Sequence, residues 1–113
     1  MIEETPPWTS ECPLKGYEIE CGGHPQVGHI ISRGKASKSV VQKQLDHVYN
    51  LAWMCADHNV GRWADQYQAL RILFRLQIDR YGREEIKEWL NGLSWKIPRY
   101  RLTYEGLALD EVL

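Results

Sequence analysis

The sequence predicts an α+β fold, in which a β-hairpin passes directly into an α-helix and continues into a helical C-terminal part. Two short apolar runs, residues 27–31 and 48–54, are rich in β-branched, aliphatic and aromatic residues, which favours strands. A 3.6-residue apolar period is plain from Ala64 onward. Cysteine and histidine residues flank the two runs at spacings that suit a metal ion. We therefore expect a zinc-braced β-β-α finger with a helical tail.

The chain length and composition suit one small domain. It has 113 residues, of which 43% are apolar and 26% charged. We divide residues 1–113 into an extended, proline-containing arm (1–11), the finger (12–63) and a helical tail packed on it (64–113). No apolar run approaches the ~18 residues of a membrane span, and the N-terminal residues lack a secretion signal. We expect a cytoplasmic protein with no membrane partner.

The finger elements follow one another without a linker. The first run carries His29 and stops before Gly34, and the second run ends at Cys55. Asp57 is then the expected start of the first helix, because its side chain suits a helix N-terminus. The order of elements is therefore strand, strand, helix.

The tail is expected to consist of helices, with a connection over residues 94–101. A helix over residues 67–81 ends at Gly82 as a cap, and a second helix runs from Arg83 to near Gly92. Thr103 is expected to cap a last short helix that reaches about Leu113. The basic, aromatic segment 95–101 before it is a candidate for stacking on bases. The apolar stripes are expected to form core: Tyr67, Leu70, Leu73, Phe74, Ile78, Tyr81, Ile86, Trp89, Leu90 and Leu93.

Three cysteines in a reducing compartment favour metal ligation over disulfides. Zinc takes four ligands, and Cys55 and His58 are close enough along the chain to share one ion. We prefer Cys12 and Cys21 as the other two. His24 is the competing choice, since it forms a second C-x-x-H pair, but it lies only five residues before His29. The alternative is that the thiols act as small buried apolar groups.

The remaining polar residues suggest phosphodiester hydrolysis. An imidazole on the first strand, His29, could take a proton from water while an amide on the following helix, Asn59, holds a hydrated divalent ion. A neutral amide oxygen suits a hard ion that keeps most of its waters, such as Mg²⁺. His47 is only three residues before Asn50, too close to face the helix, and is expected in surface packing.

These pieces resemble a known family over residues 21–109. The segments GHIISRG, YNLAWMC, CADHN, YQALRILFRLQIDRYGREEIKEWL and LTYEGL are similar to the HNH or His-Me finger endonucleases, and more narrowly to the phage NinG/Rap recombination nucleases. The resemblance implies a ββα-metal finger in which His29 is the general base, Asn50 orients it and Asn59 binds the catalytic ion. It also implies a phage- or prophage-encoded protein that acts on branched DNA in the host cell.

Two positions depart from the family pattern. Many members carry Asp or His immediately before the base as a second metal ligand, whereas this chain has Gly28. Either Asn59 holds the ion nearly alone, or Gln26 or Asp57 helps. The first C-x-x-C of the family would also need a cysteine where this chain has Glu18.

The charge distribution bears on DNA binding. The net charge is −1, which does not by itself favour a nucleic-acid partner. Residues 24–44, however, contain no acid and connect the two strands beside His29. An ordinary solvated loop is the alternative. The residues expected to contact phosphates are Arg33, Lys35, Lys38, Lys43 and Arg62.

The expected function is that of a metal-dependent DNA endonuclease with structural Zn²⁺ and catalytic Mg²⁺. One alternative is a non-catalytic zinc-stabilised module that binds DNA or protein, which Gly28 supports. Another is a phage-encoded interaction protein in which the helices do the work. The oligomeric state stays open, with a homodimer among the options.

Overall fold

The structure is a computed structural model that describes residue 6 and residues 11–32, 39–61, 67–93 and 103–111. The described part has one two-stranded antiparallel sheet with helices around it, which confirms the α+β class. The elements in order are β1 (Pro25–His29), α1 (Ser39–Leu45), the 3₁₀ helix η2 (Val48–Asn50), β2 (Leu51–Cys55), α2 (Ala56–Val60), α3 (Tyr67–Tyr81), α4 (Arg83–Asn91) and the 3₁₀ helix η4 (Leu109–Glu111).

The two strands pair from Pro25 opposite Cys55 to His29 opposite Leu51. The observed β1 therefore begins and ends two residues before the first predicted strand. The observed β2 begins three residues after the second predicted strand, because η2 occupies Val48–Asn50. The displacement arises because Asn50 occupies the end of the hairpin, where its carbonyl accepts a hydrogen bond from the Ile30 N–H at 2.7 Å. Residues 30 and 31 consequently leave the sheet and enter the core.

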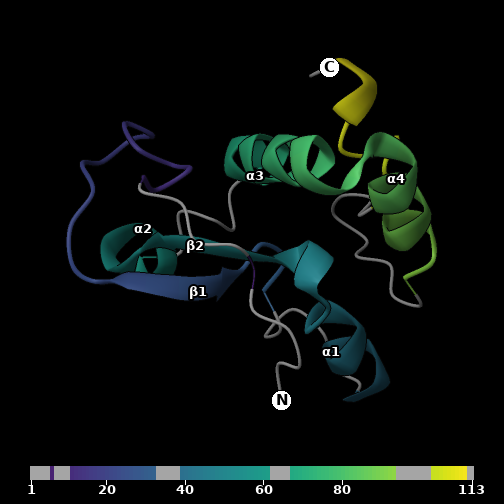
Figure 1. Cartoon of the computed structure of the whole chain (residues 1–113), viewed down its shortest axis with the longest axis horizontal. Helices are drawn as coiled ribbons and strands as arrows, with labels where there is room; N and C mark the ends of the chain where they lie inside the picture. Colours follow the sequence, from purple (N-terminus) through teal and green to yellow (C-terminus); the bar gives the residue numbers. More distant parts are fainter. Residues whose placement is uncertain (1–5, 7–10, 33–38, 62–66, 94–102, 112–113) are drawn as a thin grey trace.

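The connection between the strands contains a helix that the sequence reasoning treated only as a basic loop. Helix α1 ends at Leu45, which is fully buried, whereas Lys43 is exposed. The helix has only 7 residues, about two turns, which is too short for an apolar period to stand out in the sequence. It lies on the opposite side of the hairpin from α3 and α4 (Figure 1).

Helix α2 starts at Ala56, one residue before the predicted start at Asp57. Cys55 is the N-cap, with extended backbone angles, and its Sγ accepts a hydrogen bond from the His58 N–H at 3.4 Å. The thiol therefore does the capping that the carboxylate was expected to do. Because β2 ends at the cap residue, strand and helix follow one another directly, as predicted.

The first two tail helices, α3 and α4, match the prediction closely. Helix α3 ends at Tyr81, and Gly82 follows with φ of +100° while its N–H donates to the Ile78 carbonyl at 2.9 Å. This left-handed conformation favours glycine and separates α3 from α4. The third predicted helix, from Thr103, is instead a series of turns ending in η4, although the Thr103 hydroxyl does accept from the Gly106 N–H at 3.0 Å.

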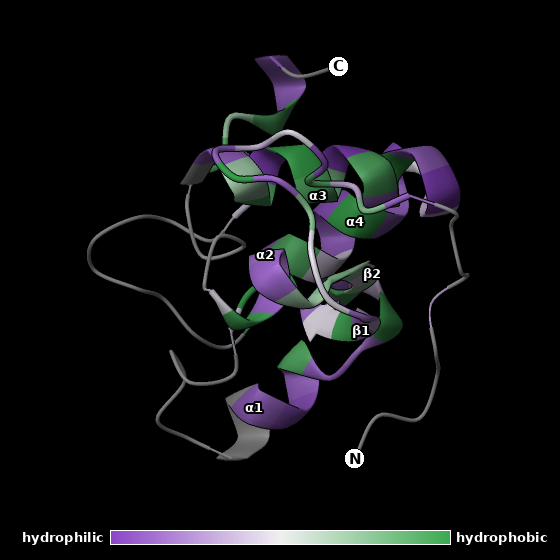
Figure 2. Cartoon of the chain, turned by 90° about the vertical axis from the view of Figure 1, so that its left-hand side faces the viewer, coloured by the Kyte–Doolittle hydropathy of each residue, from purple (hydrophilic) through white to green (hydrophobic). Residues whose placement is uncertain are grey.

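One core joins the finger to the tail. Helices α3 and α4 lie over the hairpin, and apolar and polar stretches alternate along both (Figure 2). A two-stranded hairpin is marginal on its own, so this cover is needed for stability. Of the predicted core residues, Tyr81, Trp89 and Leu93 are partly buried, and the side chain of Tyr67 lies outside the described part. The fully buried ones are Leu70, Leu73, Phe74, Ile78, Ile86 and Leu90.

The predicted N-terminal arm contacts the hairpin at one described residue. Pro6, in the predicted arm, is buried, and its carbonyl accepts a hydrogen bond from Trp53 Nε1 at 2.9 Å. The basic, aromatic segment 95–101 lies outside the described residues. Within the described ranges, every helix is too short or too polar to cross a bilayer.

Candidate functional site

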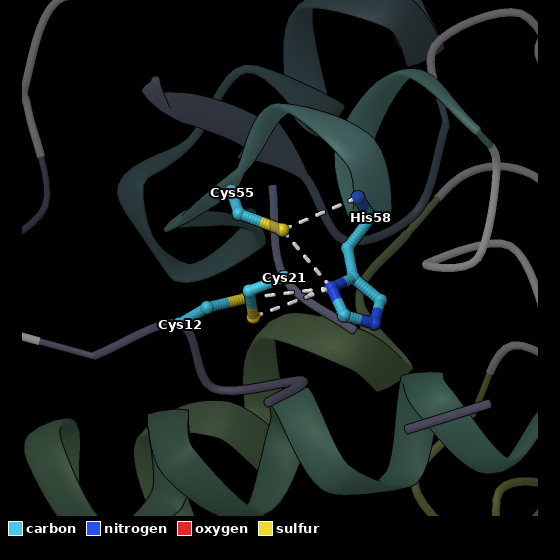
Figure 3. A group of neighbouring side chains, drawn as sticks. All are labelled: Cys12, Cys21, Cys55 and His58. Atoms are coloured by element: carbon cyan, nitrogen blue, oxygen red, sulfur yellow. Dashed lines mark hydrogen bonds between the residues drawn. The ribbon is translucent and has the colours of Figure 1, made fainter. Parts of the chain in front are cut away.

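Three thiols and one imidazole converge at the base of the hairpin. The ligand atoms of Cys12, Cys21, Cys55 and His58 all lie within 4.8 Å of one another. Figure 3 shows the four side chains pointing into one small volume. A Cys₃His set is a known structural zinc set, and its size and softness fit zinc. This group could therefore hold a metal ion such as zinc.

Two separate pieces of chain supply these side chains. Cys55 ends β2 and His58 lies in the first turn of α2, so the strand–helix junction fixes both. Cys12 and Cys21 come from the loop before β1, which is folded back by a hydrogen bond from the Lys15 N–H to the Cys12 carbonyl at 3.0 Å. The Asp57 N–H donates to the Gly22 carbonyl at 3.1 Å and joins the loop to α2.

The imidazole of His58 is oriented for ligation through Nδ1. Its Nδ1 lies 3.0 Å from Cys55 Sγ, 3.7 Å from Cys21 Sγ and 3.9 Å from Cys12 Sγ. In a tetrahedral zinc site the S···N separation is about 3.6 Å, so these distances suit an ion at the centre. On the other side of the ring, Nε2 lies 2.9 Å from the Tyr17 carbonyl. A proton on Nε2 donated to that oxygen leaves the Nδ1 lone pair for the metal.

The thiols differ in how readily they ionise. Burial raises the pKa of Cys55, but hydrogen bonds from the backbone of His58 and Gly22 outweigh it and lower that pKa to about 6. Desolvation, together with hydrogen bonds to the other two thiols, raises the pKa of Cys21 to about 12. At neutral pH the group therefore already holds a thiolate at Cys55, and metal binding would release the proton of Cys21.

The choice between Cys12 and His24 is answered by their positions. Cys12 is partly buried and belongs to the group, whereas His24 is exposed and lies outside it. Cys21, one of the three ligands shared by both predicted sets, is the one exposed member among the four. The preferred four-residue set is thus the one that the fold brings together.

His29, the predicted base, ends β1 and is hydrogen-bonded to a carboxylate. Its Nε2 lies 2.8 Å from Asp46 Oδ1, and the two side chains are 23% and 9% exposed. The sequence reasoning did not identify Asp46 as a partner of His29. The only signal was its place next to His47, which was set aside as a surface residue. His47 is indeed exposed, and its Nδ1 accepts from the Tyr49 N–H as the cap of η2.

Asn50, predicted to orient the base, is completely buried. Its Oδ1 accepts from the Ile31 N–H at 2.7 Å, and its Nδ2 donates to the carbonyls of Ile31 at 2.9 Å and Leu45 at 2.7 Å. Ile31 lies two residues after His29, and Leu45 lies next to Asp46. The amide of Asn50 therefore ties together the two chain segments that carry the His29–Asp46 pair.

Asn59, the predicted ligand of the catalytic ion, lies on α2 against β1. Its Nδ2 donates to Gln26 Oε1 at 2.9 Å, and its Oδ1 lies where a Cβ on Gly28 would come within 2.4 Å. Of the two proposed helpers, Gln26 is the one beside Asn59, whereas the carboxylate of Asp57 lies against Gly22. Within the described part His29 and Asn59 are not hydrogen-bonded to each other, since each has a different partner.

One of the residues predicted to contact phosphates, Lys43, lies in the described part of the chain. Lys43 is exposed on α1, on the same helix that leads into Asp46. Arg33, Lys35, Lys38 and Arg62 lie outside the described residues.

A further buried polar residue escaped the sequence reasoning. Gln77 on α3 is fully buried, and its Nε2 lies within hydrogen-bond distance of the carbonyls of Val48, Tyr49 and Leu51, at 3.2, 2.9 and 3.0 Å. It joins the tail to the start of β2.

No family model, curated protein or solved structure matches the chain.

Proposed function

We propose that this protein is a metal-dependent DNA endonuclease that hydrolyses phosphodiester bonds. The observation that carries the proposal is the environment of His29, a partly exposed imidazole held by a carboxylate at the end of the hairpin. A histidine in this setting suits a proton acceptor, because one ring nitrogen is fixed while the other is left for a substrate water. The resemblance to HNH nucleases, and to the NinG/Rap group in particular, supports the same role.

In the proposed reaction, His29 takes a proton from a water molecule. The water oxygen forms a new bond to phosphorus, the bond from phosphorus to the leaving sugar oxygen breaks, and that oxygen departs with a proton from solvent. Such general-base catalysis is expected to raise the rate of hydrolysis by about 10²–10⁴-fold. Asn50 contributes by fixing the segments on either side of the base.

A hydrated divalent ion such as Mg²⁺ would be held by Asn59. The hydrogen bond to Gln26 occupies the NH₂ group of Asn59 and leaves its oxygen as the ligand atom. One uncharged oxygen fits an ion that keeps most of its waters and takes further ligands from the substrate phosphate. When bound, the ion would stabilise negative charge on the phosphate and leaving oxygens.

Zinc at the Cys₃His group would act as a structural brace. It would join Cys12 and Cys21, in the loop before β1, to Cys55 and His58 at the strand–helix junction. In the described part, these two segments are otherwise joined by few hydrogen bonds. The DNA backbone would approach the face near α1, where Lys43 is exposed. The further phosphate contacts proposed from the sequence are Arg33, Lys35, Lys38 and Arg62. A reducing host-cell cytoplasm suits the free thiols.

The test is cleavage of supercoiled plasmid and of a four-way DNA junction by the zinc-loaded protein. We expect cutting with Mg²⁺ present and none when Mg²⁺ is omitted, with preference for the junction as the resemblance implies. Asn59→Ala should still bind both DNAs but cut neither, because the ion loses its protein ligand. Normal cutting by Asn59→Ala would show that the ion is held elsewhere, and binding without any cutting by the wild-type protein would refute the nuclease.

The second candidate is a non-catalytic zinc-stabilised module that binds DNA or protein. It is favoured by Gly28, which stands where many members of the family carry a second ligand and where a Cβ would displace the Asn59 amide. The plasmid experiment separates the two candidates, since this module would bind without cutting.

A further inference from the structure

We infer that Asp46 is a positioning residue for His29, holding the imidazole with its proton on Nε2 so that Nδ1 is the nitrogen that accepts a proton. The inference rests on the proposed nuclease function for its catalytic consequence, but the tautomer it specifies is a property of the free protein. It assigns to a carboxylate part of the orienting role that the resemblance gives to Asn50.

The geometry of the pair is that of a directed hydrogen bond. Asp46 Oδ1 lies 2.8 Å from His29 Nε2, within the range of charge-assisted N–H···O⁻ contacts. The carboxylate side chain is 9% exposed and the imidazole 23%, so water competes weakly for the bond. An ionised carboxylate can only accept, so the shared proton belongs to Nε2.

Both partners are held in place from outside the pair. His29 is the last residue of β1, opposite Leu51, and Asp46 follows α1 in a turn closed by its N–H to the Lys43 carbonyl at 3.2 Å. The buried amide of Asn50 bonds the neighbours of each, Ile31 and Leu45. The distance between carboxylate and imidazole is therefore fixed by backbone on both sides, as precise orientation of a base requires.

The chemical consequence concerns both nitrogens of the ring. With the proton on Nε2, the lone pair of Nδ1 is free to take a proton from water. When it does so, His29 becomes an imidazolium, and the adjacent carboxylate of Asp46 stabilises that positive charge without itself taking the proton. A half-buried carboxylate does this better than one in water, because the local dielectric is lower.

The experiment combines two readouts on the zinc-loaded full chain. The first is the ¹⁵N chemical shifts of the His29 ring in its neutral form, which distinguish a protonated from an unprotonated ring nitrogen. We expect a protonated Nε2 and an unprotonated Nδ1 in the wild-type protein, and loss of that single tautomer in Asp46→Asn, whose amide can donate as well as accept. Asp79→Asn, an exposed change on α3, should leave the His29 signals unaltered.

The second readout is the single-turnover rate of DNA cleavage with Mg²⁺. Asp46→Asn should lower it about 10²-fold or more, with Asp79→Asn unchanged and with zinc content and unfolding midpoint close to wild type. Asp46→Glu should recover part of the rate, since it restores the charge. A wild-type His29 with its proton on Nδ1, or full activity in Asp46→Asn, would overturn the inference. If the wild-type protein cuts no DNA, the nuclease proposal fails while the ¹⁵N shifts still decide the positioning.

Discussion

Asn50 shows how one buried amide can organise a site. It is fully buried, and both polar atoms of its side chain have backbone partners, in Ile31 and Leu45. Buried polar groups with complete hydrogen bonding fix a unique arrangement of the surrounding backbone. The resemblance implies that Asn50 orients His29, but no local pattern indicates that its amide joins two loops, because its partners are backbone groups.

Replacing this amide should cost considerable stability. Asn50→Ala leaves the Ile31 N–H and two carbonyls buried without a partner, and each such group costs about 1–3 kcal/mol. We expect a loss of about 3 kcal/mol in the free energy of unfolding, measured by urea denaturation. Gln26→Ala, which removes one hydrogen bond between half-buried side chains, should cost about 1 kcal/mol. Equal losses in the two variants would contradict the bridging role.

Gly28 illustrates a residue whose reason lies in packing. A Cβ there would come within 2.4 Å of Asn59 Oδ1 and 3.0 Å of Met54 Cε. The absence of a second ligand before the base is therefore linked to how closely α2 approaches β1. In the sequence, Gly28 can be recognised only because it departs from the pattern of the family that the chain resembles.

At the scale of elements, the junction of β2 and α2 carries most of the metal site. Cys55 pairs with Pro25 in the sheet, caps α2 and faces His58. The C-x-x-H spacing predicts this arrangement, since residues three apart in the first helical turn lie close together. The approach of Cys12 was a preference from spacing, and tertiary folding of the preceding loop is what brings it near.

Metal analysis tests this junction. We expect about one zinc per chain, because one tetrahedral site is formed. Cys12→Ser should lose the ion and His24→Ala should keep it, and removing zinc with a chelator should lower the thermal unfolding midpoint, since binding energy is folding energy at such a site. Acidification should also release zinc, because protons compete for the thiolates. Zinc retained by Cys12→Ser but lost from His24→Ala would reverse the ligand assignment.

The elements that sequence reasoning missed or misplaced share a physical cause. Helix α1 has only 7 residues, and η2 interrupts an apolar run that resembles a longer strand. Both are held by side-chain contacts that an apolar pattern does not reveal: Asn50 bonds the Leu45 carbonyl at the end of α1, and Gln77 on α3 bonds the carbonyls of η2 and β2. Local patterns do not encode such contacts, so the helices α3 and α4, with their strong periods, were the more predictable part.

Over the described part of the molecule, the α+β class, the direct passage of β2 into α2 and the helices α3 and α4 could be predicted from the sequence. The helix α1 between the strands and the turns in place of a third tail helix could not. The hairpin, the loop that carries Cys12 and Cys21, and the tail contribute to one hydrophobic core. Leu14 from this loop lies in the same core as Phe74 and Ile86. The metal group therefore connects directly to the core that supports β1. His29, the proposed general base, is the last residue of that strand.

The most direct measurement is the single-turnover rate of junction DNA cleavage by His29→Ala, with His24→Ala as the matched control on an exposed histidine. We expect a rate at least about 10²-fold below wild type for His29→Ala, unchanged DNA binding and zinc content, and wild-type cutting by His24→Ala. A His29→Ala protein that cuts at the wild-type rate would show that His29 is not the general base.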